Sequence, residues 1–194
     1  MAGSQMINRH IAALKKLRPG AVAEAGWFES ARYPATSGQS VGIQVARVAR
    51  MNEYGGVIDH PGGTKYITDA AVGGKNARML GTRFVKNSFQ GAHKVTAAHK
   101  ITIPSRPFMR LAWSRFSADR KTIQKRIAKD LVSGKITPDK ALGQIALILE
   151  GYIAKSIKNG NWEPNARSTV AAKGFDKPLI HSSHMLQSLS SRVI

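Results

Sequence analysis

Cysteine is absent from the 194 residues, which excludes disulfide bonds, thiolate zinc sites and cysteine nucleophiles and is compatible with assembly in a reducing cytosol. Acidic residues are scarce, because eleven Asp and Glu stand against thirty Lys and Arg and leave a formal net charge of +19. No run approaches the ~20 apolar residues of a membrane span, so no membrane partner is expected. What remains is a basic chain whose hydrophobic fraction of 42% can fill a core.

The excess of positive charge predicts an anionic partner. Self-repulsion at this net charge disfavours a compact isolated chain unless something neutralises it. Nucleic acid is one candidate, because neutralisation of phosphates by Lys and Arg is strong and independent of base sequence. Acidic protein neighbours are an equal alternative.

Three segments are predicted before residue 57. Apolar residues recur at helical spacing in the first eighteen residues, which predicts an N-terminal helix that ends at Pro19-Gly20. The Lys and Arg residues between them distinguish this segment from a secretory signal. Residues 21–32 are predicted to form a strand, and residues 41–54 a second helix that ends at Gly55-Gly56.

Two long helices are predicted for residues 108–133 and 138–159. The first has an apolar stripe and is followed by Gly134; the second begins with Thr137 as N-cap and Pro138 at the first helical position, and Gly160 ends it. The short connection predicts an antiparallel pair. The stripe of the first helix consists of Phe108, Ala112, Phe116, Ile123, Ile127 and Leu131.

The remaining segments favour β-structure. Residues 57–103 combine Gly-rich turns with short β-prone pieces, which predicts a β-rich inserted arm. Loop and strand are predicted for residues 162–170, a short helix for 184–189 and a final strand for 190–194. The predicted class is therefore α+β: a single domain over residues 1–194, with a small antiparallel sheet packed by the two long helices and the N-terminal helix.

No catalytic, cofactor-binding or metal-binding residues are predicted. His181 and His184 are three residues apart, but no carboxylate stands at ligand spacing beside them and no HExxH pattern exists. Neither a G-x-S-x-G nucleophile motif nor a phosphate-binding G-x-x-x-x-G-K-[ST] loop occurs. The sequence therefore indicates a protein that is not an enzyme and needs no cofactor.

The first long helix is unusually basic. Eight Lys and Arg lie between Arg106 and Asp130 against two Asp, which gives this segment a charge of +6. A solvated helix usually has Glu residues between its Lys and Arg, and these are missing here. Two interpretations are therefore equally open: this face contacts DNA or an acidic partner, or it is only solvated. We also expect no exposed aromatic side chain on this helix, which is typical of a contact with the nucleic-acid backbone that does not read the base sequence. The residues expected to make this contact are Arg110, Lys121, Lys125 and Lys129.

Four stretches resemble motifs of one protein family. Residues 45–55 (VARVARMNEYG) are similar to A-x-x-N-E-[FY]-G, and residues 103–110 (IPSRPFMR) to I-P-x-R-P-F-[LM]-R. Residues 162–170 (WEPNARSTV) are similar to P-N-A-x-[ST]-T, and residues 173–180 (KGFDKPLI) to K-G-x-x-K-P-L. The family's next piece, D-T-G-x-[LM]-x-x-S, reads HSSHMLQS here, a departure expected to remove a cap and a turn.

The matching positions also have a physical reading as scaffold. A residue before proline is kept out of the helical region, so the two prolines of the second stretch predict an extended entry into the long helix. Gly55, which follows the predicted helix of residues 41–54, permits a left-handed turn. The scaffold residues are Asn52, Glu53, Gly55, Pro104, Arg106, Pro107, Phe108, Pro164, Asn165, Lys173, Gly174, Pro178 and Leu179.

The family resembled is that of the tail-completion or virion-morphogenesis proteins of tailed bacteriophages, including minor tail proteins. The resemblance implies a structural subunit of the virion neck or head-proximal tail, assembled in the host cytoplasm as a homo-oligomeric, hexameric ring. Implied partners are the tail tube or tail terminator, the head connector and genomic DNA contacted without sequence specificity. Strand addition by the arm of residues 57–103 is the implied route to a neighbour.

Three alternatives remain open at this point. A tail terminator or a head-side connector would serve the same assembly and is hardly separated by these motifs. A free non-specific DNA-binding protein is favoured by charge alone, although no helix-turn-helix, zinc finger or aromatic platform is visible. A hydrolase lacks a recognisable site.

Overall fold

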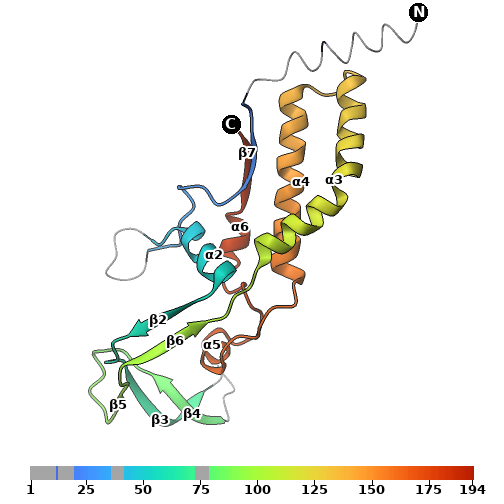
Figure 1. The fold of residues 1–194 in the computed structure, drawn as a ribbon. Helices are drawn as coiled ribbons and strands as arrows, with labels where there is room; N and C mark the ends of the chain where they lie inside the picture. Colours follow the sequence, from blue (N-terminus) through green and yellow to red (C-terminus); the bar gives the residue numbers. More distant parts are fainter. Residues whose placement is uncertain (1–11, 13–19, 36–41, 73–78) are drawn as a thin grey trace, which may run out of the picture. The chain divides into compact units, whose positions relative to one another are not determined.

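The structure is a computed structural model that describes residues 12, 20–35, 42–72 and 79–194 (Figure 1). Over these residues the predicted α+β class is confirmed, because helices accompany three small antiparallel sheets. The predicted N-terminal helix, apart from Ala12, lies outside the described residues. The chain divides into two compact units, and each is described by itself. The first unit consists of Met1–Ala49, Pro107–Gly160 and Ser182–Ile194, and the second of Arg50–Arg106 and Asn161–His181.

The first unit is built on two long helices that lie side by side, α3 (Phe108–Val132) and α4 (Pro138–Asn159) (Figure 1). Both agree with the helices predicted from periodicity. Phe108 meets Ser156, and farther along α3 Phe116 meets Tyr152, as expected for antiparallel helices. The apolar stripe of α3 faces this contact. Its buried members are Phe108, Ala112, Phe116, Ile123 and Ile127.

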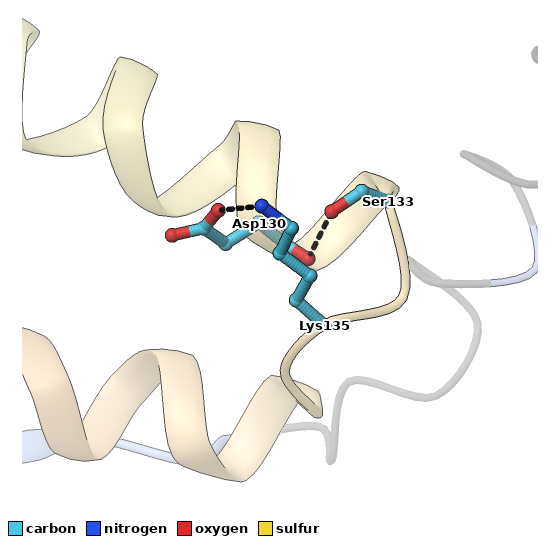
Figure 2. A network of polar contacts seen from close by, with 3 residues as sticks. All are labelled: Asp130, Ser133 and Lys135. Atoms are coloured by element: carbon cyan, nitrogen blue, oxygen red, sulfur yellow. Dashed lines mark hydrogen bonds and ion pairs between the residues drawn. The ribbon is translucent and has the colours of Figure 1, made fainter.

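Polar contacts close the turn between the two helices. Ser133 donates from its hydroxyl to the Asp130 carbonyl oxygen at 3.0 Å, and the Lys135 ammonium lies 3.9 Å from the Asp130 carboxylate (Figure 2). Gly134 takes a left-handed φ of +74°, which suits a glycine just past a helix end. On the other side of the turn, the Thr137 hydroxyl accepts from the Lys140 backbone N–H at 3.3 Å. The N-cap expected from the sequence is therefore present.

A two-stranded antiparallel ribbon packs against α4 in the same unit. It consists of β1 (Ala23–Gly26) and β7 (Ser190–Val193), and the cross-strand neighbours Glu24 and Arg192 form an ion pair at 3.0 Å. After β1, the Trp27 indole N–H donates to the Met185 carbonyl at 2.7 Å, in the short helix α6 (His184–Gln187). The edge of the Trp27 ring faces the Phe108 ring at 5.9 Å. These contacts join the two ends of the described chain to the start of α3.

Helix α2 (Val45–Tyr54) begins later than the predicted residue 41 and continues into the second unit. Its start is set by backbone pairing, because the Tyr33 N–H donates to the Ile43 carbonyl and the Val45 N–H to the Ala31 carbonyl, both at 2.9 Å. Gln44 is bridged to Arg32 in the same pairing, so the chain is extended up to Gln44 and the helix begins only at Val45. The predicted strand of residues 21–32 is likewise shortened to β1.

The second unit contains the β-rich segment. Strands β2 (Gly56–His60) and β6 (His99–Ile103) form an antiparallel ribbon, in which Ile58 faces Ile101. A second sheet has the order β4-β3-β5 and is also antiparallel. Its strands are β3 (Lys65–Val72), β4 (Met79–Phe84) and β5 (Lys94–Val95).

The prediction of loop and strand for residues 162–170 is wrong in its last part. Residues Arg167–Lys173 form helix α5. The β-branched pair Thr169-Val170 favoured a strand, but the two alanines that follow favour a helix and Gly174 ends it. Gly174 has a left-handed φ of +82° and donates its N–H to the Val170 carbonyl, a helix-ending turn.

Candidate functional site: the Arg106 cluster and the basic face of helix α3

Arg106 lies on the segment that follows β6 in the second unit, and only 6% of its surface is exposed. Its guanidinium donates to the Glu163 carbonyl through Nε at 3.1 Å and Nη2 at 3.0 Å, and to the Pro164 carbonyl at 3.3 Å. Nη1 reaches the Asn52 side-chain oxygen at 3.4 Å, and the Arg106 backbone N–H donates to the Asn52 carbonyl at 2.7 Å. One side chain therefore ties together three segments that are far apart in sequence.

The electrostatics fit a cation held by carbonyl oxygens. Burial lowers the pKa of Arg106, and the negative charges of Glu163 and Asp176 act in the opposite direction. Burial also lowers the pKa of Lys173, again against the effect of Asp176. A guanidinium remains protonated in proteins, so Arg106 is a permanent buried charge whose donors are satisfied largely by backbone.

Two backbone segments next to Arg106, at Gly55 and at Ile103, lie very close to each other. Gly55 has a φ of +69°, and a side-chain carbon added to it would lie 2.6 Å from the Ile103 carbonyl oxygen. Only glycine fits a left-handed position at that distance. Beside it, the Ser105 hydroxyl donates to the carbonyl of Glu53 at 2.8 Å, and Glu53 is itself buried. The end of α2 and the end of β6 are therefore held in direct contact.

The last two resembling stretches meet in the same unit. The Asp176 carboxylate accepts from the backbone N–H of Asn165 at 3.1 Å and from its side-chain amide at 2.8 Å. The Lys173 ammonium donates to the Lys177 carbonyl at 2.7 Å and lies 4.9 Å from the centre of the Phe175 ring. These bonds fold the chain after α5 back toward Asn165.

We call this set of residues the Arg106 cluster. It consists of Asn52, Glu53, Gly55, Ser105, Arg106, Glu163, Pro164, Asn165, Lys173 and Asp176. Ser105, Glu163 and Asp176 were missed from the sequence, and the hydrogen bonds that Arg106 makes to Glu163 go to its backbone carbonyl, which no side-chain pattern reveals. Pro178 and Leu179 are half-buried beyond the cluster, and Pro104 is half-buried just before Arg106.

Pro107 and Phe108 belong to the first unit. Pro107 stands at the N-cap of α3 without a side-chain hydrogen bond, and Phe108 is completely buried. The Phe108 carbonyl, which opens the helix, accepts from the buried Ser156 hydroxyl at 2.8 Å. Phe108 therefore anchors the start of α3 to α4.

The departure from the family pattern at residues 181–183 is informative. Ser183 stands where the pattern has glycine, and it has a left-handed φ of +59°. Its carbonyl accepts from the N–H groups of Leu186 and Gln187, but its side chain makes no cap hydrogen bond. The expectation that the turn is lost is therefore wrong, whereas the cap is indeed absent.

The basic side chains expected on α3 are exposed. Arg110, Lys121, Lys125 and Lys129 all lie off the buried stripe. The expectation that this helix has no exposed aromatic is wrong, because Trp113 is 58% exposed and stacks on Phe116 with 5.7 Å between ring centres. Its position off the apolar stripe was the sequence feature that pointed to exposure.

Three of the described histidines, His60, His99 and His184, make packing contacts. His60 and His99 face each other across β2 and β6 with 4.9 Å between ring centres, and His184 Nε2 lies 2.6 Å from the Arg32 carbonyl oxygen. Over the described stretches, no three His, Asp or Glu side chains are grouped as a metal site would require. None of the helices described is long and apolar enough to span a membrane.

The fold and the Arg106 cluster together define a mixed α+β protein whose main buried polar contacts hold its backbone together. Comparisons with protein-family models, with curated proteins and with solved structures each found no match.

Proposed function

We propose that this chain is a structural subunit of the neck or head-proximal tail end of a tailed bacteriophage. In this proposal it completes the tail and mediates head–tail joining as part of a homo-oligomeric ring, and it is not an enzyme. The supporting observation is the convergence of the resembling stretches: Asn52, Arg106 and Pro164 come from three of them and meet around one guanidinium. The fourth stretch contributes Asp176, which binds Asn165.

The convergence supports the resemblance for a physical reason. Matches scattered by chance over the chain have no reason to lie in contact, whereas parts of one scaffold do. The buried Arg106 guanidinium requires acceptors, because a buried donor without a partner costs about 1–3 kcal/mol, so the segments that supply these acceptors are held in one geometry.

The β2–β6 ribbon supports a role in assembly. Val57 is 60% exposed, Ile58 40% and Ile101 39%, so apolar side chains on both of its faces meet solvent. An isolated two-stranded ribbon is at best marginally stable in water, and strand edges are templates for pairing with another chain. In the proposal, this ribbon reaches a neighbouring subunit or a tail-tube protein by strand addition.

Disruption of the gene in its phage or prophage, followed by electron microscopy of the lysate, tests the proposal. Filled heads beside unjoined tails of normal length support tail completion. Overlong tubes would favour the alternative role of tail terminator, and leaking heads that of a head-side connector. Intact infectious virions would contradict the proposal and leave free non-specific DNA binding as the remaining candidate.

Complementation of the disrupted phage gives a sharper test of the ribbon. The double variant Ile58→Lys/Ile101→Lys keeps both strands but places charges on the exposed apolar pair. It is expected to fold and to fail in joining, whereas Asp59→Lys/Lys100→Asp, which reverses the solvated neighbouring pair, is expected to complement. Full complementation by the first variant would rule out the ribbon as the joining arm.

A further inference from the structure

A pocket of about 610 Å³ opens along the α3–α4 hairpin of the first unit. Residues three or four apart share a helix flank, so one flank of each helix supplies its walls. The α3 flank contributes Arg115 and Asp119. The α4 flank contributes Ile148, Gly151, Tyr152, Lys155 and Asn159.

Gly151 lines the pocket and leaves α4 without a side chain at this position. A carbon added there would meet nothing within 4 Å, so the helix surface is bare and open at this position. Tyr152 stands beside it and is fixed in place, because its ring meets the edge of Phe116 at 5.9 Å and its hydroxyl donates to the Asp119 carboxylate. This hydrogen bond raises the pKa of Tyr152.

Arg115 and Lys155, the two cations of the pocket, form no ion pair among the described residues. The one carboxylate present, Asp119, is engaged by the neutral Tyr152 hydroxyl instead. Arg115, Lys155 and Asp119 together leave the pocket with one net positive charge, and an anion bound between the two cations would lower their mutual repulsion.

We propose that this pocket binds a phosphate group of a polynucleotide backbone. The Arg115 guanidinium and the Lys155 ammonium hold the phosphate oxygens, and the Asn159 amide is a further donor. A tetrahedral phosphodiester can accept from donors on both helices at once, because the pocket walls come from α3 and α4. The contact reads no base, because every group involved binds the backbone.

An anionic polymer is favoured over a single small anion by what surrounds the pocket. Lys121, Lys125 and Lys129 follow each other at four-residue spacing on α3 and are all exposed. At 100° per residue, Lys125 lies roughly a quarter turn from Arg115 around the helix axis. A backbone seated in the pocket therefore has further cations within reach. The inference rests on the proposed function only in identifying the polynucleotide as genomic DNA, the partner that the family resemblance implies.

The test measures binding of the full-length protein to a fluorescent DNA duplex by anisotropy at several salt concentrations. Arg115→Gln/Lys155→Gln is expected to weaken binding at least tenfold and to reduce the slope of log affinity against log salt by about 2. The control Lys140→Gln/Lys177→Gln removes the same charge from exposed sites outside the pocket and is expected to weaken binding no more than about threefold. Equal losses in the two variants, or none, would overturn the proposal.

A second variant fills the pocket without changing charge. Gly151→Gln places a side chain in open space and improves helix propensity, so the fold is retained, as circular dichroism checks. It is expected to reduce DNA affinity and leave the melting temperature unchanged or raised. Undiminished affinity would overturn the pocket as the binding site.

Competitors identify the ligand class. Polyglutamate is the first competitor. If it displaces DNA from the wild type and also binds the pocket variants as weakly as DNA does, the ligand of the pocket is an acidic protein. Saturation by inorganic phosphate at low millimolar concentration, with DNA binding unaffected, would assign it to a small anion. Either result overturns the proposal. The gene disruption tests the phage role independently of the pocket. If DNA binding depends on the pocket but the disrupted phage is fully infectious, only the phage role is refuted.

Discussion

The guanidinium of Arg106 donates to backbone carbonyls of Glu163 and Pro164 rather than to a carboxylate. Glu163 and Asp176 are both exposed, and the Asp176 carboxylate accepts from Asn165. The planar fork of arginine can span two successive carbonyls and the Asn52 amide, whereas the compact ammonium of lysine cannot. The position therefore depends on geometry as well as charge.

Arg106→Lys is expected to lower the free energy of unfolding by about 2–4 kcal/mol, because it keeps the buried charge and loses most of its hydrogen bonds. Urea denaturation followed by circular dichroism measures this loss. The matched change Arg167→Lys, at an exposed position on α5, is expected to stay within about 0.5 kcal/mol. Similar values for the two variants would show that the Arg106 bonds contribute little.

Ser183→Gly is expected to stabilise the protein by about 0.5–1 kcal/mol. A non-glycine residue in the left-handed region is strained by about 1–2 kcal/mol, and the added flexibility of glycine in the unfolded chain offsets part of the gain. Thermal denaturation measures the difference. Ser182→Gly, one residue earlier and without a positive φ, is expected to destabilise. Loss of stability in both variants would contradict the strain argument.

At the scale of elements, local chemistry predicts α3 and α4 well. Thr137 and Pro138 mark the start of α4, and an apolar stripe marks the buried side of α3. Both features are local, because the cap involves neighbouring residues and the stripe repeats with the helical period. The sequence alone therefore predicts both helices. Helix α5 was missed because the β-branched pair Thr169-Val170 outweighed the short helical context in a seven-residue element.

The N-cap of α4 can be tested directly. Thr137→Ala is expected to cost about 1 kcal/mol of unfolding free energy, because the Lys140 N–H loses its acceptor. Thr122→Ala, at an exposed position inside α3, removes the same atoms and is expected to be neutral or slightly stabilising. A midpoint in urea that falls for Thr137→Ala but not for Thr122→Ala shows the loss of the cap, and equal midpoints would show that water replaces it.

Contacts between elements that are remote in sequence could not be predicted. Glu24 and Arg192 are paired across β1 and β7, and nothing local in either strand identifies the other as its partner. The same holds for Arg106 and the carbonyl of Glu163, and for the pocket between Arg115 and Lys155. Motif matching named many residues of the Arg106 cluster, but only the fold shows that they meet.

At the scale of the molecule, the chain passes between its two units four times, at residues 49–50, 106–107, 160–161 and 181–182. Each unit is therefore made of discontinuous segments. A truncation that aims to isolate one unit would remove parts of the other, so the full chain is the proper object for every experiment above.

The charge of the whole chain makes a further prediction. With a formal net charge of +19, self-repulsion destabilises the compact state, and salt screens it. The melting temperature is expected to rise by several degrees between about 20 and 200 mM salt. Lys121→Glu/Lys125→Glu/Lys129→Glu, which lowers the net charge by two at each site, is expected to flatten this dependence. A salt-independent wild type would show that the charges are already well separated.

Trp113 gives the protein an optical reporter of its own. Its indole is more than half exposed on the basic helix, whereas the other two tryptophans, Trp27 and Trp162, are mostly covered. Iodide, an anionic collisional quencher drawn to nearby Lys and Arg, should therefore extinguish mainly the red-shifted part of the emission. Any molecule that settles on this face of α3 will shield that fluorescence, so occupancy can be followed by light without a label.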